Sequence, residues 1–448
     1  MLWKTVWMNV SVSCSESDGA EMREMRDSGS SWVGAIPSNW EMLRGKYVFE
    51  QKSDRGNTKS LVLLSPTQNY GVIPQDLYEE LSGFSAVKLN EKTNLNDLKA
   101  VHKGAFVISL RSFQGGFEYS EYEGVVSPAY QVFYPSVKVN EGYYKYLFKD
   151  KSFIEKINSY TMSLRDGKNI AFADFGRTYI PMPSYDEQVR IASFLDSLCS
   201  EIDSLSADIQ SEIETLEAYK RSVITEAVTI GLNPDVEMKD SGIEWVEEVP
   251  AHWHIHPVYY YFGERKSKNY RLQEQNLLSL SYGKIIRKDI NASGGLLPAS
   301  FNTYNIIEAG DIIIRPTDLQ NDKKSLRTGL ATERGIITSA YIDLMPKREV
   351  SSEYFHYLLH SYDIQKVFYN MGNGVRQGLN YSEFSKLLVI EPPIEEQKEI
   401  VNYLNCKCSE IDTIISQKKE QIKVLADYKK SLIYEYVTGK KEVNNGVI

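Results

Sequence analysis

The sequence has few cysteines and no long apolar run. Its four cysteines, Cys14, Cys199, Cys406 and Cys408, are too few among 448 residues for a disulfide framework, so a reducing cytoplasm fits better. No stretch approaches the roughly 18 apolar residues of a membrane-spanning helix, so we expect no membrane span. With 42% hydrophobic and 25% charged residues, the composition is that of a globular protein, and the length predicts two to four domains.

The sequence also lacks an excess of positive charge. The 51 Lys and Arg residues face 60 Asp and Glu residues, which gives a net charge of −9. Taken alone, this balance argues against a nucleic-acid binder, because phosphate contacts need clustered basic residues. However, residues 184–230 carry 3 basic and 10 acidic groups and so supply −7 of the total. Residues 32–183 (18 basic, 16 acidic) and 231–390 (18 basic, 19 acidic) are nearly neutral, so the charge argues against DNA along residues 184–230 alone.

Motifs of phosphate-binding and methyl-transfer enzymes are missing. The sequence has no G-x-x-x-x-G-K-[ST] loop, and residues 438–441 (Thr-Gly-Lys-Lys) are interpreted as a helix end. It has no D/N-P-P-Y/F loop of an adenine methyltransferase, and residues 391–394 (Glu-Pro-Pro-Ile) are interpreted as a helix entry. We therefore expect a chain without catalytic residues and without a cofactor of its own.

Two groups of residues resemble metal or nuclease sites. The first is His252, His254 and His256, and the second is Asp318, Asp322 and Lys324. Neither group has counterparts in the internal repeat described next. Exposed loop histidines are therefore favoured over a metal site, and a nuclease cluster is the weaker interpretation.

The sequence contains an internal repeat. Residues 24–29 (Glu-Met-Arg-Asp-Ser-Gly) with Trp32, Pro37 and Trp40 match residues 237–242 (Glu-Met-Lys-Asp-Ser-Gly) with their own Trp, Pro and Trp at an offset of 213. Residues 187–229 match residues 396–438 with 18 identities in 43 positions. The chain therefore reads as variable domain, helix, variable domain, helix.

The repeat predicts the domain boundaries. It begins near Glu24, so we expect Met22 or Met25 to be the functional start and the preceding residues to lie outside the fold. The predicted segments are an N-terminal extension (1–23), the first domain (24–183), the first helix (184–230), a linker and second domain (231–390), the second helix (391–441) and a tail (442–448).

Both repeated helical segments have an apolar seam with alternating spacings of four and three residues. Ser184 with Glu187 predicts a capping box at the first helix, and Pro392-Pro393 precedes the second. At 1.5 Å per residue each helix would be roughly 65 Å long, too long for ordinary packing inside a domain. The simplest expectation is that the two helices pair as an antiparallel coiled coil with pseudo-two-fold symmetry; in the alternative, each binds a separate partner. The predicted seam comprises Ile191, Leu195, Leu198, Ile202, Leu205, Ile209, Leu216, Ile400, Leu404, Ile411, Ile414 and Leu425.

The two variable domains are predicted to have a mixed α+β fold. Residues 106–110, 125–126, 311–314 and 336–338 are predicted strands, and residues 143–157 and 352–368 are predicted helices. Their loops gather Arg, Gln and Asn, which pair with base edges, and Lys, which contacts phosphates. For any single residue, a solvated loop explains the pattern equally well. The candidate DNA-binding residues are Arg111, Ser112, Gln114, Gly115, Gly116, Arg165, Lys168, Asn169, Arg315, Asp318, Gln320, Asn321, Lys323, Lys324, Arg327, Arg376, Gln377 and Asn380.

These features together resemble the specificity subunit of type I restriction–modification enzymes. The resemblance rests on D-S-G…W-V-G…I-P…W at 27–40 and its copy at 240–253, and on G-x-F-V-I-S-L-R-S-F-Q-G-G at 104–116. It also rests on S-P-A-Y at 127–130 and on the doubled E-Q…L…E-I-D helix starts. It covers essentially residues 24–440. One departure is Ala105, where its repeat partner has Asp311.

The resemblance implies a non-catalytic, cytoplasmic DNA-binding subunit that takes part in DNA methylation and phage defence. Each variable domain would be a target-recognition domain for one half of a bipartite, gapped site in double-stranded DNA, and the coiled coil would set the spacing. Two modification subunits would dock on the helices, and restriction subunits would join them. S-adenosylmethionine, ATP and Mg would belong to these partners. The alternative is a coiled-coil scaffold whose terminal domains bind proteins.

Overall fold

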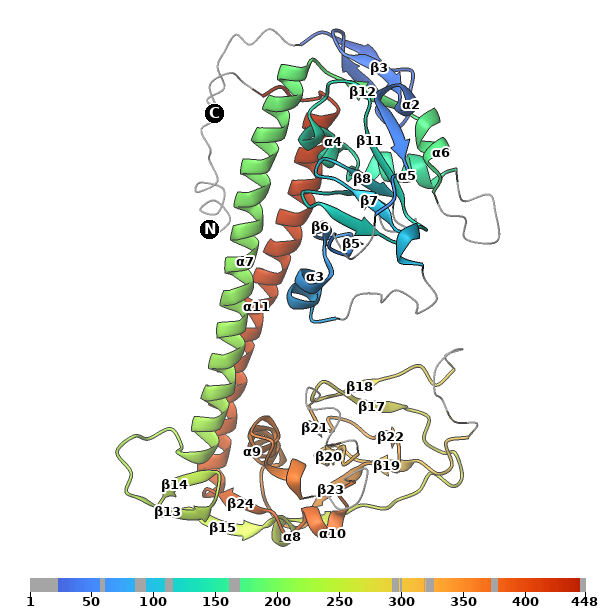
Figure 1. Ribbon diagram of the computed structural model, residues 1–448. Coiled ribbons are helices and arrows are strands. Elements are labelled where there is room, and N and C mark those ends of the chain that lie inside the picture. The colour runs from blue at the N-terminus through green and yellow to red at the C-terminus, as the bar shows by residue number, and fades with distance from the viewer. Residues whose placement is uncertain are drawn as a thin grey trace. The chain divides into compact units, whose positions relative to one another are not determined.

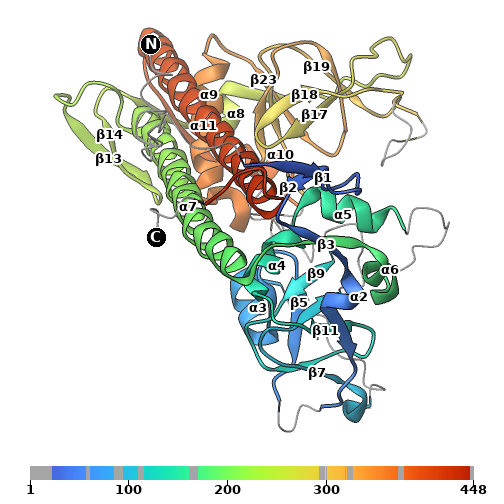
Figure 2. The same ribbon diagram turned by 90° about the horizontal axis from the view of Figure 1, so that it is seen from above.

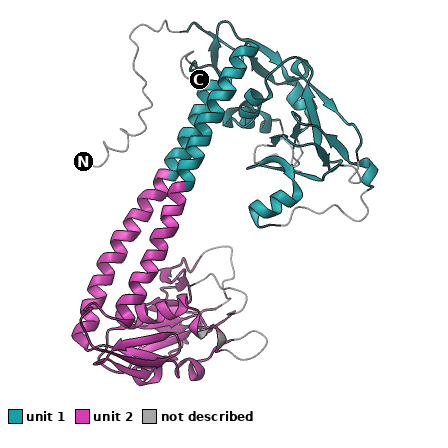
Figure 3. Cartoon of the chain, turned by 60° about the vertical axis from the view of Figure 1, so that its left-hand side comes forward, with its two compact units in different colours: residues 1–207, 422–448 teal, residues 208–421 magenta. Residues whose placement is uncertain are grey.

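The computed structural model describes residues 23–56, 61–84, 94–108, 116–160, 170–291, 298, 300–317, 319, 326–371 and 378–443. The chain divides into two compact units (Figure 3). Unit 1 comprises residues 1–207 and 422–448, and unit 2 comprises residues 208–421. Each unit therefore contains one variable domain and a segment of each long helix.

The elements follow one another in the same general order in the two halves of the chain (Figure 1). The first half comprises β1 (Met25–Asp27), β2 (Ala35–Pro37), β3 (Glu41–Arg44), α2 (Gly45–Val48), β4 (Phe49–Lys52), β5 (Leu64–Thr67), β6 (Gly71–Pro74), α3 (Gln75–Ser82), η1 (Leu95–Asp97), β7 (Lys99–Val101), β8 (Phe106–Ile108), β9 (Phe117–Tyr119), β10 (Gly124–Val126), β11 (Gln131–Pro135), α4 (Glu141–Leu147), α5 (Lys151–Asn158), α6 (Phe172–Arg177), β12 (Tyr179–Met182) and α7 (Tyr185–Thr229). The second half comprises β13 (Met238–Ile243), β14 (Val246–Pro250), β15 (His254–Pro257), α8 (Val258–Tyr261), β16 (Phe262–Glu264), β17 (Leu278–Ser281), β18 (Lys284–Arg287), β19 (Asn305–Ile307), β20 (Ile312–Ile314), β21 (Thr328–Leu330), β22 (Gly335–Ile337), β23 (Ile342–Pro346), α9 (Ser352–Ile364), η3 (Val367–Asn370), α10 (Tyr381–Phe384), β24 (Leu388–Glu391) and α11 (Ile394–Val437).

Each unit contains a four-stranded antiparallel sheet of the same topology. The strand order is β4-β11-β8-β9 in unit 1 and β16-β23-β20-β21 in unit 2. Side chains alternate between the two faces of a strand, and both faces are covered. On β8, Phe106 and Ile108 join the large core beside the helices, whereas Val107 joins a smaller cluster on the opposite face. The predicted mixed α+β fold in tandem repeat is confirmed.

One predicted helix is in fact two. Residues 143–157 were expected to form a single amphipathic helix, but the chain forms α4 and then α5. Asp150 causes the break, because its carboxylate accepts hydrogen bonds from the backbone N–H groups of Ser152 and Phe153 at 2.9 and 3.1 Å. A side chain that caps a new first turn ends the preceding helix.

The two long helices, α7 and α11, lie side by side and antiparallel within each unit (Figures 1 and 2). In unit 1, Lys429 of α11 binds Asp203 of α7, with Nζ at 2.6 Å from Oδ1. In unit 2, Lys220 of α7 binds Asp412 of α11, with Nζ at 2.7 Å from Oδ2. The two ion pairs are equivalent in the repeat, since Asp203 corresponds to Asp412 and Lys220 to Lys429. The predicted antiparallel coiled coil is confirmed.

The helix seam differs from the prediction at alternate layers. Leu205 and Ile414 are 40% and 41% exposed, and Leu198 is half-buried. The residues after them, Cys199, Ser206 and Ile415, lie in the seam instead. Apolar content had favoured Leu198, Leu205 and Ile414. Cys199 and its repeat counterpart Cys408 instead pack into the cores of the two units. The buried or half-buried stripe comprises Leu195, Cys199, Ile202, Ser206, Ile209, Ile213, Leu216, Lys220, Val223, Leu404, Cys408, Ile411, Ile415, Lys418, Ile422, Leu425, Lys429 and Leu432, and Ile191 and Ile400 are also buried.

The start of each long helix is fixed to its domain by a Glu-Gln pair. The Glu187 carboxylate accepts a hydrogen bond from the indole N–H of Trp40 at 2.9 Å. Glu396 accepts the equivalent bond from Trp253 at 3.0 Å. Gln188, fully buried, accepts from the backbone N–H of Asn140 at 2.8 Å and donates to the carbonyl of Pro183 at 2.9 Å.

This arrangement corrects the predicted capping box. Ser184 accepts a hydrogen bond from the backbone N–H of Glu187 at 3.4 Å, as expected. The Glu187 carboxylate does not return to the helix cap, because it binds Trp40 and also Arg23, whose Nη2 lies 2.5 Å away. A buried carboxylate needs hydrogen-bond donors, and the indole supplies one.

A buried charge cluster distinguishes unit 2 from unit 1. Arg265 donates two hydrogen bonds to Asp311, at 2.7 and 3.0 Å, and its Nε lies 3.9 Å from the buried Asp343. In unit 1 the two repeat positions are the buried Ala105 and Val132. The Ala105 departure is therefore part of a consistent exchange, in which an apolar pair replaces two buried carboxylates.

The seam assignment predicts different costs for two neighbouring truncations. Ile202→Ala removes a buried side chain and should lower the free energy of unfolding by about 2–5 kcal/mol. Leu205→Ala, the matched control on an exposed position, should change it by less than about 0.5 kcal/mol. Thermal melting of the full chain measures both variants. A larger loss of stability in Leu205→Ala than in Ile202→Ala would support the seam predicted from the sequence.

The charge cluster predicts a pH dependence of stability. Burial and the neighbouring Asp311 raise the pKa of Asp343 to about 8, from 3.8. The folded state thus binds this proton more tightly than the unfolded state, so stability should fall as the pH rises from about 4 to about 8. Asp343→Asn should flatten this decline, measured as the melting temperature at a series of pH values. Asp311→Asn, the control, should destabilise unit 2 because it loses a charged acceptor for Arg265. An unchanged slope in Asp343→Asn would contradict the assignment.

Candidate nucleic-acid interface

The structure describes four of the predicted DNA-binding residues: Gly116, Arg315, Arg327 and Asn380. The other fourteen lie outside the described residues: Arg111, Ser112, Gln114, Gly115, Arg165, Lys168, Asn169, Asp318, Gln320, Asn321, Lys323, Lys324, Arg376 and Gln377. The chain that flanks these loops is described. It establishes where the loops leave and re-enter the fold.

In unit 1 the ends of the two predicted loops meet. Gly116 directly precedes β9, and a Cβ placed on it would lie 3.2 Å from Cδ1 of Ile170, the first described residue after segment 161–169. The Gly116 φ of +45° also favours glycine. Gln131 of β11 joins this edge, since its side-chain N–H donates to the carbonyl of Ile170 at 2.8 Å and its oxygen accepts from the N–H of Phe172 at 2.8 Å.

In unit 2 the equivalent loop ends also meet. The backbone N–H of Leu379, after segment 372–377, donates to the carbonyl of Pro316 at 3.0 Å. The other end of the first loop is fixed by strand pairing, because Ile314 of β20 is opposite Thr328 of β21. Each unit therefore brings two loops that are about 50 residues apart in sequence to one edge of its sheet, as a composite binding surface requires.

The prediction that Arg327 binds DNA is wrong, because its side chain is not available to DNA. It is fully buried and donates from Nε to the Tyr369 hydroxyl at 2.9 Å and from Nη1 to the carbonyl of Thr317. Its guanidinium also lies over the Tyr369 ring, and that hydroxyl donates to Asp363 at 3.1 Å. Arg327 thus ties the end of the 318–325 loop to the residue before its start. No local pattern predicts this role, since Asp363 and Tyr369 lie more than 35 residues away in the chain.

The other two described candidates lie at the loop ends. Arg315 is half-buried, and its backbone N–H donates to the carbonyl of Arg327 at 2.8 Å. Asn380 is exposed at the start of α10, where its side-chain oxygen accepts from the N–H of Glu383 at 3.0 Å. This capping bond uses the amide oxygen of Asn380 and forms part of a capping box with Glu383.

The other candidate sites do not assemble. His254 and His256 lie on strand β15, not on a loop, and His252 binds Glu396 at 2.9 Å. The described residues include no group of three or more His, Cys, Asp or Glu side chains arranged to hold a metal ion. Asp318, Asp322 and Lys324 lie outside the described residues. Within the described part of the chain, no helix has the length and apolar character to cross a bilayer.

Comparison with protein families identifies the type I restriction modification DNA specificity domain, which matches residues 37–215 and 327–424. The matched residues make up more than half of the chain. They contain the four-stranded sheet of unit 1, two of the four strands of the unit 2 sheet, and most of both long helices.

Two similar proteins come from Methanocaldococcus jannaschii. The type I restriction enzyme MjaVIII specificity subunit is 22% identical over 431 residues, which cover 92% of this chain and 95% of that protein. The putative type I restriction enzyme MjaX specificity subunit is 24% identical over 273 residues, which span 59% of each. The sequence likeness to the first thus extends over nearly the whole repeat.

A solved chain has the same fold. It was described in work on complex assembly and conformational transition of the type I R-M system, and it aligns with a TM-score of 0.65 at 14% identity. The alignment covers 91% of this chain and 99% of the solved one. At this identity the likeness shows a common fold.

The buried position of Arg327 generates a prediction. Arg327→Ala leaves Asp363 without its charged neighbour and should lower the free energy of unfolding by about 3–5 kcal/mol. Arg315→Ala, a half-buried position at the same loop, should leave the melting temperature nearly unchanged and act on DNA binding. Thermal melting and DNA-binding assays separate the two variants. A stable Arg327→Ala protein with altered base preference would contradict the anchoring role and show that Arg327 reads bases.

Proposed function

Because this chain belongs to the family of type I restriction–modification specificity subunits, we propose that each of its two variable domains reads one half of a bipartite DNA site. The observation that carries the proposal is the repeated loop edge. In unit 1, Gly116 and Ile170 bring two polar loops together, and in unit 2 Pro316 and Leu379 do the same. Two copies of one surface in one chain suit a target with two separate half-sites.

The residue types of the loops support direct reading of bases. Arg pairs bidentately with guanine, and Asn and Gln pair bidentately with adenine, each worth about 1–3 kcal/mol of discrimination. Unit 1 supplies Arg111, Gln114 and Asn169, and unit 2 supplies Arg315 and Gln377. Lysines in the same loops supply phosphate contacts, which position the protein on the duplex without reading sequence.

The long helices set the gap between half-sites and hold the partner subunits in this proposal. The acidity of α7 supports a protein-facing role, since residues 184–230 carry −7. Part of that charge serves the coiled coil, where Asp203 and Glu212 bind lysines of α11. An acidic rod repels phosphates, so much of the attraction to DNA comes from the partners and the isolated chain binds weakly.

The chemistry of the assembly resides in other chains. Two modification subunits bring S-adenosylmethionine and take the target adenine out of the duplex. Restriction subunits bring ATP and Mg. This chain contributes recognition and has no catalytic residues of its own. A protein-binding scaffold, the alternative function, has no specific observation in its favour.

Methylome sequencing tests the proposal. A host that carries this gene with its modification and restriction genes should methylate adenine in one bipartite motif with a fixed gap. Deleting this gene should abolish that methylation, and a host carrying an unrelated specificity gene serves as control. An assembled complex that methylates no motif would contradict DNA recognition and favour the scaffold.

The spacing role gives a separate prediction. Four residues inserted in α7 beside Asp208 add about 6 Å of helix and should lengthen the gap in the methylated motif. Four residues inserted at Asn233, in the exposed segment after α7, are the control and should leave the gap unchanged. An unchanged gap in the first variant would show that the coiled coil does not set the spacing.

A further inference from the structure

The β17–β18 hairpin of unit 2 ends in an unusual turn. Ser281 pairs with Lys284, so the loop consists of Tyr282 and Gly283, both with positive φ, at 48° and 77°. Two positive φ angles define a type I′ turn, whose first position favours Asn, Asp or Gly. Tyrosine adopts this left-handed conformation at a cost, and such outliers in a fold point to a function.

The Tyr282 side chain is presented to solvent. It is 82% exposed, more than any other large hydrophobic side chain among the described residues. An asparagine would fill the turn at lower free energy and without an exposed ring. The turn itself therefore gains nothing from the aromatic ring, which is exposed for a contact outside the chain.

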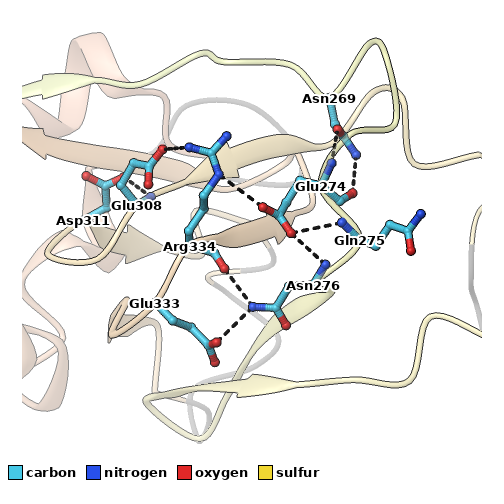
Figure 4. Close-up of polar contacts among 8 residues, drawn as sticks. All are labelled: Asn269, Glu274, Gln275, Asn276, Glu308, Asp311, Glu333 and Arg334. Carbon is cyan, nitrogen blue, oxygen red and sulfur yellow. Dashed lines mark hydrogen bonds and ion pairs between the residues drawn. The ribbon is translucent and has the colours of Figure 1, made fainter.

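The hairpin is held rigidly at its base. The Asn276 side chain, before β17, donates to the Glu333 carboxylate at 3.1 Å and to the carbonyl of Arg334 at 2.7 Å (Figure 4). Arg287 of β18 binds the same Glu333, with Nε at 2.7 Å from Oε1. Arg334 in turn binds Glu274 and Glu308 (Figure 4). A ring on a preorganised support loses little entropy when it binds.

The tip of the hairpin adjoins the candidate nucleic-acid interface. A Cβ placed on Gly283 would lie 3.1 Å from Cδ1 of Leu326. Leu326 follows the 318–325 loop and precedes Arg327, which anchors that loop. Tyr282 is therefore next in space to the re-entry point of a proposed base-reading loop.

The charge around the tip favours a polyanion. From Tyr282 to Asp289 the chain has three basic residues and one acidic residue. Arg287 is neutralised by Glu333, and Lys288 lies at the base of the hairpin, where its backbone N–H donates to the carbonyl of Leu277 at 2.8 Å. Lys284, which directly follows the turn, is the exposed lysine beside the tyrosine. A lysine beside an exposed aromatic ring matches a duplex, whose phosphates border its grooves.

We propose that Tyr282 contacts double-stranded DNA, with its ring packed against sugars and base edges in a groove beside the half-site read by unit 2. Lys284 contacts an adjacent phosphate. This inference rests on the proposed function and adds a specific contact that lies outside the polar loops. It applies to unit 2. The repeat counterpart Tyr70 is 42% exposed, and no basic residue follows it as far as Gln75.

The test uses the full chain assembled with its modification subunits and a fluorescent duplex carrying the motif found by methylome sequencing. Tyr282→Ala should weaken binding about tenfold or more, as expected for one buried aromatic side chain. Tyr282→Asn should weaken binding equally while it leaves the melting temperature unchanged or higher, because Asn suits the turn. Lys284→Ala should lower the salt dependence of binding by about one ion.

Tyr270→Ala is the matched control. Tyr270 is 76% exposed on the same unit, but it lies in a turn closed by Asn269 and Glu274 (Figure 4), and its loss should change affinity less than about twofold. Wild-type affinity in Tyr282→Asn would overturn the inference and leave the proposed function intact. Impaired assembly with normal DNA affinity of the assembled complex would identify a protein contact and overturn it too. A wild-type complex that recognises no DNA motif would overturn both.

Discussion

The structure depends on how each domain holds the ends of two different helices. In unit 1, Trp40 binds the first turn of α7 through Glu187, while the Tyr143 hydroxyl donates to the carbonyl of Val437 in the last turn of α11 at 2.7 Å. In unit 2, Trp253 binds the first turn of α11, and Tyr354 donates to the carbonyl of Val228 in the last turn of α7 at 3.1 Å. All four bonds are buried or nearly so, and helix ends leave backbone groups that need such partners. The antiparallel pairing follows from this constraint, because each domain requires one helix start and one helix end.

The repeated motifs of the sequence are explained by these contacts. The indole of each repeated Trp donates a hydrogen bond to the repeated Glu, which is buried at Glu187 and half-buried at Glu396. The Gln that follows each Glu binds the domain on one side and the helix entry on the other. The equivalent ion pairs Asp203–Lys429 and Asp412–Lys220 also help to fix the register of α7 against α11. Exposed ion pairs contribute little stability individually. Their value lies in disfavouring other alignments of two helices whose apolar seams alone would tolerate a shift.

The fold was largely predictable from the sequence. The predictions that were wrong have identifiable physical causes. Periodicity located both helices, because apolar spacing reports which face is buried. It placed Leu205 in the seam and missed Ser206, because composition favours the more apolar of two adjacent residues. Only the tertiary structure, in which Ser206 is half-buried and Leu205 is exposed, decides between them. Likewise, the local cap at Asp150 divides a helix that its amphipathic pattern predicted as continuous.

At the candidate interface, too, local sequence predicted some features and tertiary contacts decided the others. The sequence by itself determined the repeat, the order of domains and helices, the family resemblance and the polar composition of the loops, since each of these depends on residue identity and local spacing. Tertiary structure alone decided that loops about 50 residues apart share one edge, that Arg327 is an internal anchor and that Tyr282 projects beside that edge. Burial and proximity arise from contacts between residues distant in the chain, such as Pro316 with Leu379 and Arg327 with Tyr369, and no local pattern encodes them.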